Sequence, residues 1–323
     1  MSKKFSPSLF LWDLWCTVSI VGIWPRFIEP NLLTTTHLKL PIKNLPSELQ
    51  GLKIVQFSDL HMNPKVKDNF LNRLSKKINC LKPDMIVFCG DLINHGKVRQ
   101  PERIKKFLNS LTAPYGCFAI YGNHDYSGCI TVNNQGDYDV WQGSNSQISE
   151  GFKRVFGPKV VLSKKVTEAA KSIPESLELR QLWSETPFTL LHNETQLIPI
   201  KGSHLNITGL GEYILGKCKP ETAFATHDSH YPTLVLAHNP DSISNLENYP
   251  GDVILSGHTH GGQINLPWIW RKLTLMENPH LKKGLFHIKD HWLYVNRGIG
   301  ESMPFRWFAY PEILSLTLEN HGK

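Results

Sequence analysis

Residues 53–61 read KIVQFSDLH, an apolar and partly β-branched run that ends in a carboxylate and an imidazole. Two later runs have the same form, MIVFCGD at 85–91 and CFAIYGNHD at 117–125. Residues 69–83, between the first two runs, carry apolar side chains at helical spacing. Short apolar strands joined by a helical crossover predict an α/β fold with neighbouring parallel strands.

Further β-rich runs follow, and they are too many for one open sheet. They lie at residues 189–200, 204–212, 233–240, 252–260, 291–300 and 312–318. We therefore expect an α/β fold with two packed, mixed sheets flanked by helices, an αββα sandwich. A stretch punctuated by Pro30, Pro41 and Pro46 precedes the first run, and no strand is assigned to it.

Five short motifs end these runs: DLH at 59–61, GD at 90–91, GNHD at 122–125, HNP at 238–240 and GHTH at 257–260. In an α/β fold the carboxyl ends of strands meet at one rim, so distant residues come together there. Each motif alone is weak evidence, because a single histidine at a strand end is more often an ordinary polar residue. The ordered set is far more specific.

Carboxylate, imidazole and carboxamide groups together suit Mn²⁺, Fe²⁺, Zn²⁺ or Ni²⁺ better than Ca²⁺. The number of candidate ligands predicts two ions, with a carboxylate such as that of Asp91 bridging them. The candidate ligands are Asp59, His61, Asp91, Asn123, His238, His258 and His260. The other histidines fit no ligand spacing, and we interpret the pair His227 and His230 as part of a solvated loop.

The formal charge of +7 and the pI of about 9.0 favour an anionic partner. Nucleic acid, an acidic membrane surface and a phosphorylated metabolite all fit that charge. The basic residues are not interleaved with aromatic ones, so a nucleic acid is not expected. Nothing in the sequence implies an obligate protein partner.

The six cysteines contain no CxxC pair, and Cys89 and Cys117 lie inside apolar runs. This pattern indicates reduced thiols in a reducing compartment. A disulfide between one pair remains the alternative, because spacing alone does not exclude it.

Residues 1–33 form an N-terminal segment that precedes the domain expected at 34–323. Residues 9–24 are almost entirely apolar, include three tryptophans and follow Lys3 and Lys4. The apolar run is short for a bilayer span and lacks a signal-peptidase pattern, so an anchor in the headgroup interface is the favoured interpretation. The alternative is an amphipathic arm packed on the domain.

Residues 126–188 form a long insertion that begins with a stretch rich in Asn, Gln, Gly and Ser and continues as a basic, helical one. Loops of this length beside a site are usually functional. We expect a lid or a substrate-binding element.

The five motifs resemble the signature of the calcineurin-like metallophosphoesterase superfamily over residues 52 to about 318. The resemblance implies two metal sites, the first formed by Asp59, His61, Asp91 and His260 and the second by Asp91, Asn123, His238 and His258. It also implies that His124 protonates the leaving group or steadies the transition state. Asp125 is then expected to orient the His124 imidazole.

The flanking sequences RFIEPNLL (26–33) and YVNRGIGESMPFRWFAYPEILSLTL (294–318) resemble a membrane-associated branch of this superfamily. Some members of that branch are UDP-2,3-diacylglucosamine pyrophosphatases of lipid A synthesis. The resemblance therefore implies hydrolysis to UMP and an acylated sugar 1-phosphate at the cytoplasmic face of the bacterial inner membrane, by a peripheral or monotopic enzyme. A departure is His124, where the commoner enzyme for this reaction has Arg.

Arg297 and Arg306 are expected near the rim, where either could grip phosphate, and a surface salt bridge is the alternative for each. A membrane-tethered phosphodiesterase of other substrates is the second hypothesis. A non-catalytic scaffold is a weaker hypothesis, since every expected metal ligand is present. A nuclease is weaker still, because the basic residues form no patch interleaved with aromatic ones.

Overall fold

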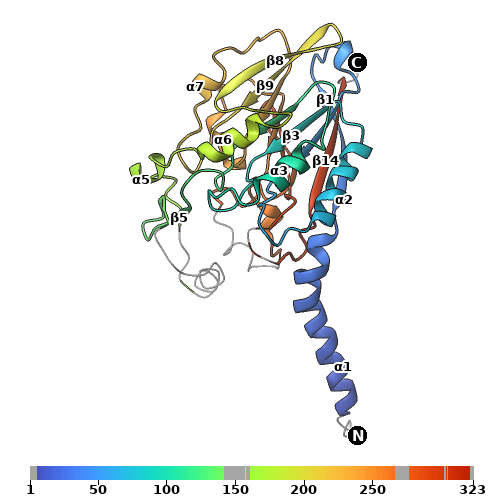
Figure 1. Ribbon diagram of the computed structural model, residues 1–323. Helices are drawn as coiled ribbons and strands as arrows, with labels where there is room; N and C mark the ends of the chain where they lie inside the picture. The colour runs from blue at the N-terminus through green and yellow to red at the C-terminus, as the bar shows by residue number, and fades with distance from the viewer. Residues whose placement is uncertain are drawn as a thin grey trace.

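Two six-stranded sheets form the centre of the molecule (Figure 1). A computed structural model describes residues 6–141, 157, 161–265, 276–301, 303 and 305–320. The first sheet has the order β1 (Thr34–Ile42), β14 (Glu312–Asn320), β2 (Lys53–Phe57), β3 (Met85–Cys89), β4 (Cys117–Ile120), β7 (Phe188–Leu190). The second has the order β12 (Gly284–Ile288), β13 (His291–Val295), β11 (Val253–Ser256), β10 (Thr233–Leu236), β9 (Ser203–Gly209), β8 (Glu194–Ile200). Both sheets mix parallel and antiparallel pairs, which confirms the predicted αββα sandwich.

The central strands are apolar on both faces because each face packs against a different layer. In β3, Ile86 and Phe88 belong to the core under the helices, whereas Met85 and Val87 belong to the core between the sheets. Successive side chains of a strand point to opposite faces, so this continuous apolar run fills both cores.

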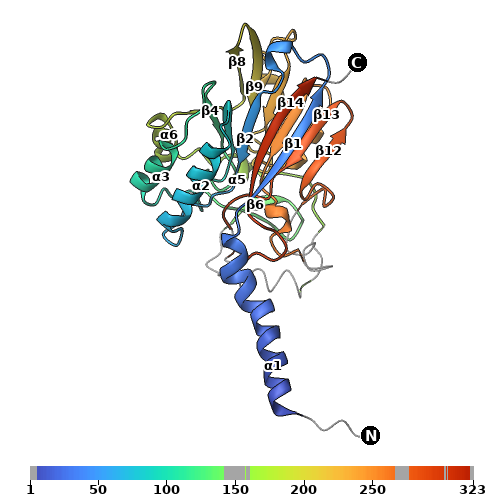
Figure 2. The same ribbon diagram turned by 90° about the vertical axis from the view of Figure 1, so that its right-hand side faces the viewer.

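Three helices cover the outer face of the first sheet: α2 (Asp68–Cys80), α3 (Pro101–Leu108) and α6 (Leu177–Ser184). Figure 2 shows α2 and α3 on one side of this sheet and β12 and β13 on the other. The second sheet is covered by α7 (Pro220–Ala223) and the 3₁₀ helix η4 (Pro240–Asn245). Among the described residues, the other elements of the domain are η3 (Ser47–Leu49), a hairpin of β5 (Ile130–Val132) and β6 (Tyr138–Val140), α5 (Glu168–Lys171) and η5 (His260–Gly262).

Strand β1 was not expected, because its sequence contains Pro41. It lies at the edge of the first sheet and pairs in parallel with β14 alone. An edge strand tolerates proline because one of its sides needs no backbone donor.

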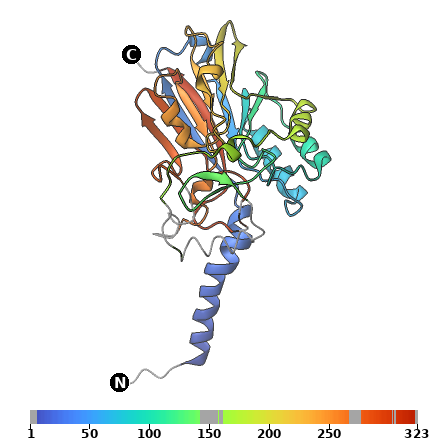
Figure 3. The same cartoon turned by 90° about the vertical axis from the view of Figure 1, so that its left-hand side faces the viewer.

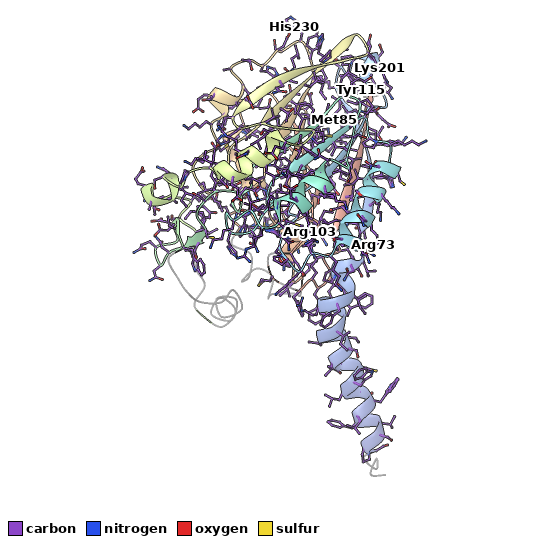
Figure 4. All side chains as sticks on the ribbon, in the orientation of Figure 1. Arg73, Met85, Arg103, Tyr115, Lys201 and His230 are labelled. Carbon is purple, nitrogen blue, oxygen red and sulfur yellow. The ribbon has the colours of Figure 1, made fainter. Side chains whose placement is uncertain are left out.

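A helical rod precedes β1, and its N-terminal part stands clear of the domain (Figures 3 and 4). It consists of α1 (Pro7–Val18), the π-helical η1 (Ser19–Ile28) and the short η2 (Glu29–Asn31). No residue of α1 is buried, so the alternative of an arm packed on the domain is wrong. The whole rod, Pro7–Asn31, has 25 residues and is long and apolar enough to cross a membrane, by length and composition.

The anchor rod and the carboxyl end of β2 lie at the same end of the sandwich. Strand β1 begins directly after η2, runs parallel to β14, and β14 is antiparallel to β2. Strand β2 therefore ends where β1 begins. The segment that follows β2 is DLH at 59–61.

All six cysteines are free thiols, which confirms that part of the expectation. Within the insertion 126–188, residues 142–156 and 158–160 lie outside the described residues. The predicted basic helical stretch, residues 151–171, falls partly among them, and in its described part only α5 (Glu168–Lys171) is helical.

Candidate metal centre

The five motifs meet at the rim that faces the anchor end. Backbone hydrogen bonds join the ends of β2 and β3, from Asp59 N to Gly90 O (2.9 Å) and from His61 N to Asp91 O (3.0 Å). The end of β11 joins the same rim, because His258 N donates to Asp59 Oδ1 at 3.0 Å. The ends of β2, β3 and β11 thus come together at one rim.

One group of ligand atoms surrounds a point beside β2. The Nε2 atoms of His61 and His260 lie 3.0 Å apart. His61 Nε2 lies 3.6 Å from Asp91 Oδ2, and His260 Nε2 lies 3.7 Å from Asp59 Oδ1. This is the first of the two ligand sets that the sequence resemblance implied.

A second group surrounds a point beside β10. His238 Nε2 lies 3.2 Å from both Asp91 Oδ2 and Asn123 Oδ1, and His258 Nδ1 lies 2.8 Å from Asn123 Oδ1. His238 Nδ1 faces the Cys89 carbonyl at 2.7 Å, so the proton sits on Nδ1 and leaves Nε2 as a lone-pair donor. Asp91 is the carboxylate shared by both groups.

The backbone at this rim is strained. Asp59, His61, Asp91, His258 and His260 all have positive φ values, between 47° and 67°. L-residues other than Gly and Asn rarely adopt this conformation, which costs roughly 1–3 kcal/mol for each residue. The free-energy cost of this conformation is smaller for Asp and His than for β-branched residues.

The small residues of the motifs have a steric role. A Cβ on Gly257 would lie 2.5 Å from Asp59 Oδ2, and a Cβ on Gly90 would lie 2.6 Å from His238 Nδ1. Glycine is therefore required at these two positions for the ligands to converge.

Burial sets the charge of the cluster. It raises the pKa of Asp59 to about 7 and lowers the pKa values of His61 and His258 to about 3. Burial opposes the ionised form of Asp91, but His238 overcomes it and holds the pKa of Asp91 well below its usual value. The cluster therefore holds an ionised Asp91 beside the neutral imidazoles of His61 and His258. Burial opposes the charged form of His238, but Asp91 raises the pKa of His238 well above its usual value.

This donor set fits a pair of divalent cations. Two imidazole Nε2 lone pairs 3.0 Å apart repel each other unless a cation or a proton lies between them. The carboxylates Asp59 and Asp91 are buried, and burying such groups is costly without a compensating charge. The mixture of nitrogen and oxygen donors is typical of catalytic transition-metal sites.

Comparisons with known proteins agree with this geometry. Residues 52–262 match the family described as calcineurin-like phosphoesterase, which is more than half of the chain. The chain belongs to this family. It is a metal-dependent hydrolase of phosphoester or pyrophosphate bonds, and the family uses divalent metals.

Three relatives of this phosphoesterase are informative. The UDP-2,3-diacylglucosamine pyrophosphatase LpxG of Chlamydia trachomatis is 40% identical over 91% of this chain and 92% of its own. The phosphodiesterase YaeI of Escherichia coli is 27% identical over 82% of each chain. A transmembrane protein with metallophosphoesterase domain from Danio rerio is 26% identical over 98% of this chain and 64% of its own. With the exposed apolar rod, these similarities indicate that the phosphoesterase associates with a membrane.

His124 lies at the edge of the metal centre. Its backbone N–H donates to Asp91 Oδ1 at 2.7 Å, and its ring packs edge-on against His61 at 4.9 Å between centroids. Burial lowers the pKa of His124, and its buried Nδ1 has no hydrogen-bond partner among the residues that the structure describes. The imidazole is therefore poised for an additional partner.

Asp125 does not have the position expected for it. Its carboxylate accepts backbone N–H groups of Asp91, Ile93 and Gly122 at 2.7, 3.0 and 2.9 Å. The expected role of orienting the His124 imidazole does not fit these contacts. Asp125 instead fixes the loops after β3 and β4 to each other, because one side chain binds donors from both.

Arg306 and Arg297 are both committed to protein partners. Arg306 is fully buried, and its guanidinium donates to the carbonyls of Arg297, Gly298, Gly300 and Ala309. Its Nη2 also lies 3.3 Å from His260 Nδ1. A phosphate-gripping role does not fit a guanidinium whose N–H groups are so occupied.

Arg297 is held by a carboxylate. Its Nε donates to Glu312 Oε2 at 3.1 Å, and Nη2 donates to Thr34 Oγ1 at 3.2 Å. The salt bridge that the sequence left as the alternative is therefore present. It joins the end of β13 to the starts of β14 and β1.

The sequence analysis did not identify two residues that lie near the metal centre. Glu212 follows β9 at the same rim and is buried, which raises its pKa to about 7. His95 packs its ring 5.3 Å from that of His124. Glu212 had a signal, because it ends the run HLNITGLGE as the ligands end theirs, but His95 follows no strand and had none.

Proposed function

We propose that this phosphoesterase is a UDP-2,3-diacylglucosamine pyrophosphatase. With two divalent ions, Mn²⁺ first among the candidates, it would convert UDP-2,3-diacylglucosamine and water to UMP and 2,3-diacylglucosamine 1-phosphate. We place it at the cytoplasmic face of the bacterial inner membrane. The 40% identity to the relative of that name, over nearly the whole of both chains, supports the proposal.

The observation that carries the proposal is the common location of anchor and rim. The anchor rod leads into β1 at the end of the sandwich where β2 delivers Asp59 and His61. A substrate with acyl chains in the bilayer and a diphosphate at its surface would meet the metal centre there. A water-soluble substrate would need no such arrangement.

Different side chains would have different roles in the reaction. Two bound cations would lower the pKa of a water and neutralise charge on the phosphoryl oxygens. Asp59, His61, Asp91 and His260 would hold one cation, and Asp91, Asn123, His238 and His258 the other. His124 would give a proton to the leaving phosphate oxygen, and the nearby His95 ring would limit its rotation.

The insertion 126–188 stays a prediction as a substrate-binding element, as do the domain limits 1–33 and 34–323. Hydrogen bonds between the insertion and the core support the substrate-binding role. Tyr138 of the insertion and Tyr213 of the core both donate to the buried Glu277 carboxylate, each at 3.1 Å. The insertion is thereby tied to a loop of the catalytic domain.

The test is hydrolysis by the full-length protein in lipid–detergent micelles with Mn²⁺. We expect UMP release from UDP-2,3-diacylglucosamine and none with the Asp91→Asn variant. Absence of UMP release by a protein that still binds metal would refute the proposal.

The second candidate is a membrane-associated phosphodiesterase of other substrates. His124 favours it, since the commoner pyrophosphatase has Arg at this place in the motif, and so does the similarity to the phosphodiesterase YaeI. Hydrolysis of bis(p-nitrophenyl) phosphate or of phospholipids without UMP release would select it.

A further inference from the structure

Three aromatic residues are gathered in the loop of residues 305–309, which we name the aromatic loop. The Phe305 and Trp307 rings lie 6.2 Å apart, and the Trp307 and Phe308 rings are stacked 6.0 Å apart. Phe308 is 53% exposed, an unusual position for a large apolar side chain in a tightly bonded loop.

The backbone of Phe308 also has an unfavourable conformation. Its φ is 56°, in the left-handed region that glycine and asparagine tolerate and that bulky residues avoid. A phenylalanine held there is thus both strained and exposed to solvent. Strained backbone of this kind clusters at active sites and ligand-binding segments, which makes Phe308 a candidate for a role in binding.

The aromatic loop is bonded to the base of the anchor rod on both sides of Phe308. Arg306 N donates to Pro25 O at 2.8 Å, and Ala309 N donates to Glu29 Oε1 at 2.6 Å. The rod exposes apolar side chains at the same level, since Phe27 is 63% exposed. Phe308 is therefore an exposed aromatic side chain at the level of the base of the anchor.

The same loop is bonded to the metal centre. Arg306 Nη2 lies 3.3 Å from His260 Nδ1, and Trp307 N donates to Gln263 O at 2.8 Å, three residues after His260. One short segment thus contacts both the anchor and a candidate metal ligand.

We propose that the aromatic loop is a second membrane-binding element, in which Phe308 inserts into the headgroup region of the bilayer that holds the anchor. Aromatic side chains favour this region because it is apolar on one side and hydrated on the other. With two points of contact, the anchor and the loop fix the orientation of the rim toward the bilayer. The proposal goes beyond the proposed function, because it holds for any membrane-bound substrate.

Photo-crosslinking of the full-length protein in nanodiscs of phosphatidylethanolamine and phosphatidylglycerol tests the contact directly, with no substrate added. Benzoyl-phenylalanine replaces Phe308 in one protein and Leu197 in a control. Leu197 is 38% exposed and lies in β8, at the end away from the anchor (Figure 1). We expect lipid adducts at position 308 and few at 197; equal yields, or adducts between two protein chains at 308, would overturn the proposal.

Kinetics of Phe308→Asn test the consequence. Asparagine tolerates the left-handed backbone, so the melting temperature should be unchanged or higher. We expect kcat/KM for UDP-2,3-diacylglucosamine in nanodiscs to fall about tenfold, as the loss of one buried aromatic contact implies, and bis(p-nitrophenyl) phosphate hydrolysis to stay within about twofold. Equal losses on both substrates would overturn the proposal. If the wild-type protein releases no UMP, the proposed function fails while the crosslinking result stands.

Discussion

The Nε2 atom of His61 lies 3.0 Å from the Nε2 atom of His260, although the two residues follow different sheets. Both nitrogens have lone pairs to offer when a cation is bound, and both side chains are buried. Without a cation, a proton on one of the two nitrogens must lie between them, so metal binding displaces that proton.

Removal of metal should lower the stability of the folded protein. Ligand binding at a hundredfold its Kd contributes about 2.7 kcal/mol, so chelation should lower Tm by about 5 °C or more. Calorimetry with and without EDTA measures this. The Asp91→Asn protein should respond much less, and an equal response of both proteins would contradict a metal site that contains Asp91.

Asp91→Asn should lower kcat by about 10³-fold or more, because it removes the carboxylate shared by both ligand groups. Metal content measured by mass spectrometry should fall below that of the wild type. Asp290→Asn is the matched control, since Asp290 is exposed. An Asp91→Asn protein with full metal content and full activity would refute the bridging role.

His124→Gln should reduce kcat by about 10²–10⁴-fold while the metal content stays unchanged. The loss should be smaller for a p-nitrophenyl ester, whose leaving group needs no proton, than for an alkyl phosphodiester, whose alkoxide leaving group does. His230→Gln is the control, because His230 lies at the end of the molecule opposite the anchor (Figure 4). Equal losses on both substrates would exclude a proton donor.

Asp241 should make stability depend on pH. Burial, with a contribution from Glu277, raises the pKa of Asp241 from 3.8 to about 6. The folded state then binds the proton more tightly than the unfolded one, so the stabilisation is present below pH 4 and is lost as pH rises to 6. The loss is at most about 3 kcal/mol. Urea unfolding at pH 4.5 and 7 should show that Asp241→Asn removes part of this difference, and an unchanged difference would contradict the assignment.

The pattern of apolar runs with polar ends was enough to predict the αββα sandwich and the seven candidate ligands. The alternation of side chains along a strand and the convergence of strand ends at one rim hold for α/β folds in general, so both can be applied to a sequence without coordinates. Strand β1 escaped prediction because Pro41 is acceptable only at an edge, and edge position is a property of the whole sheet.

The sequence by itself thus determined the layers, the order of the motifs and the chemistry of the ligand set. Tertiary structure decided the partners of each charged group: Asp125 accepts backbone donors, Arg306 donates to carbonyls beside His260, and Glu212 lies buried at the same rim. It also decided that the anchor and the rim share one end. The physical reason is that hydrogen bonds and burial depend on which distant segments meet, and a motif specifies only its own few residues.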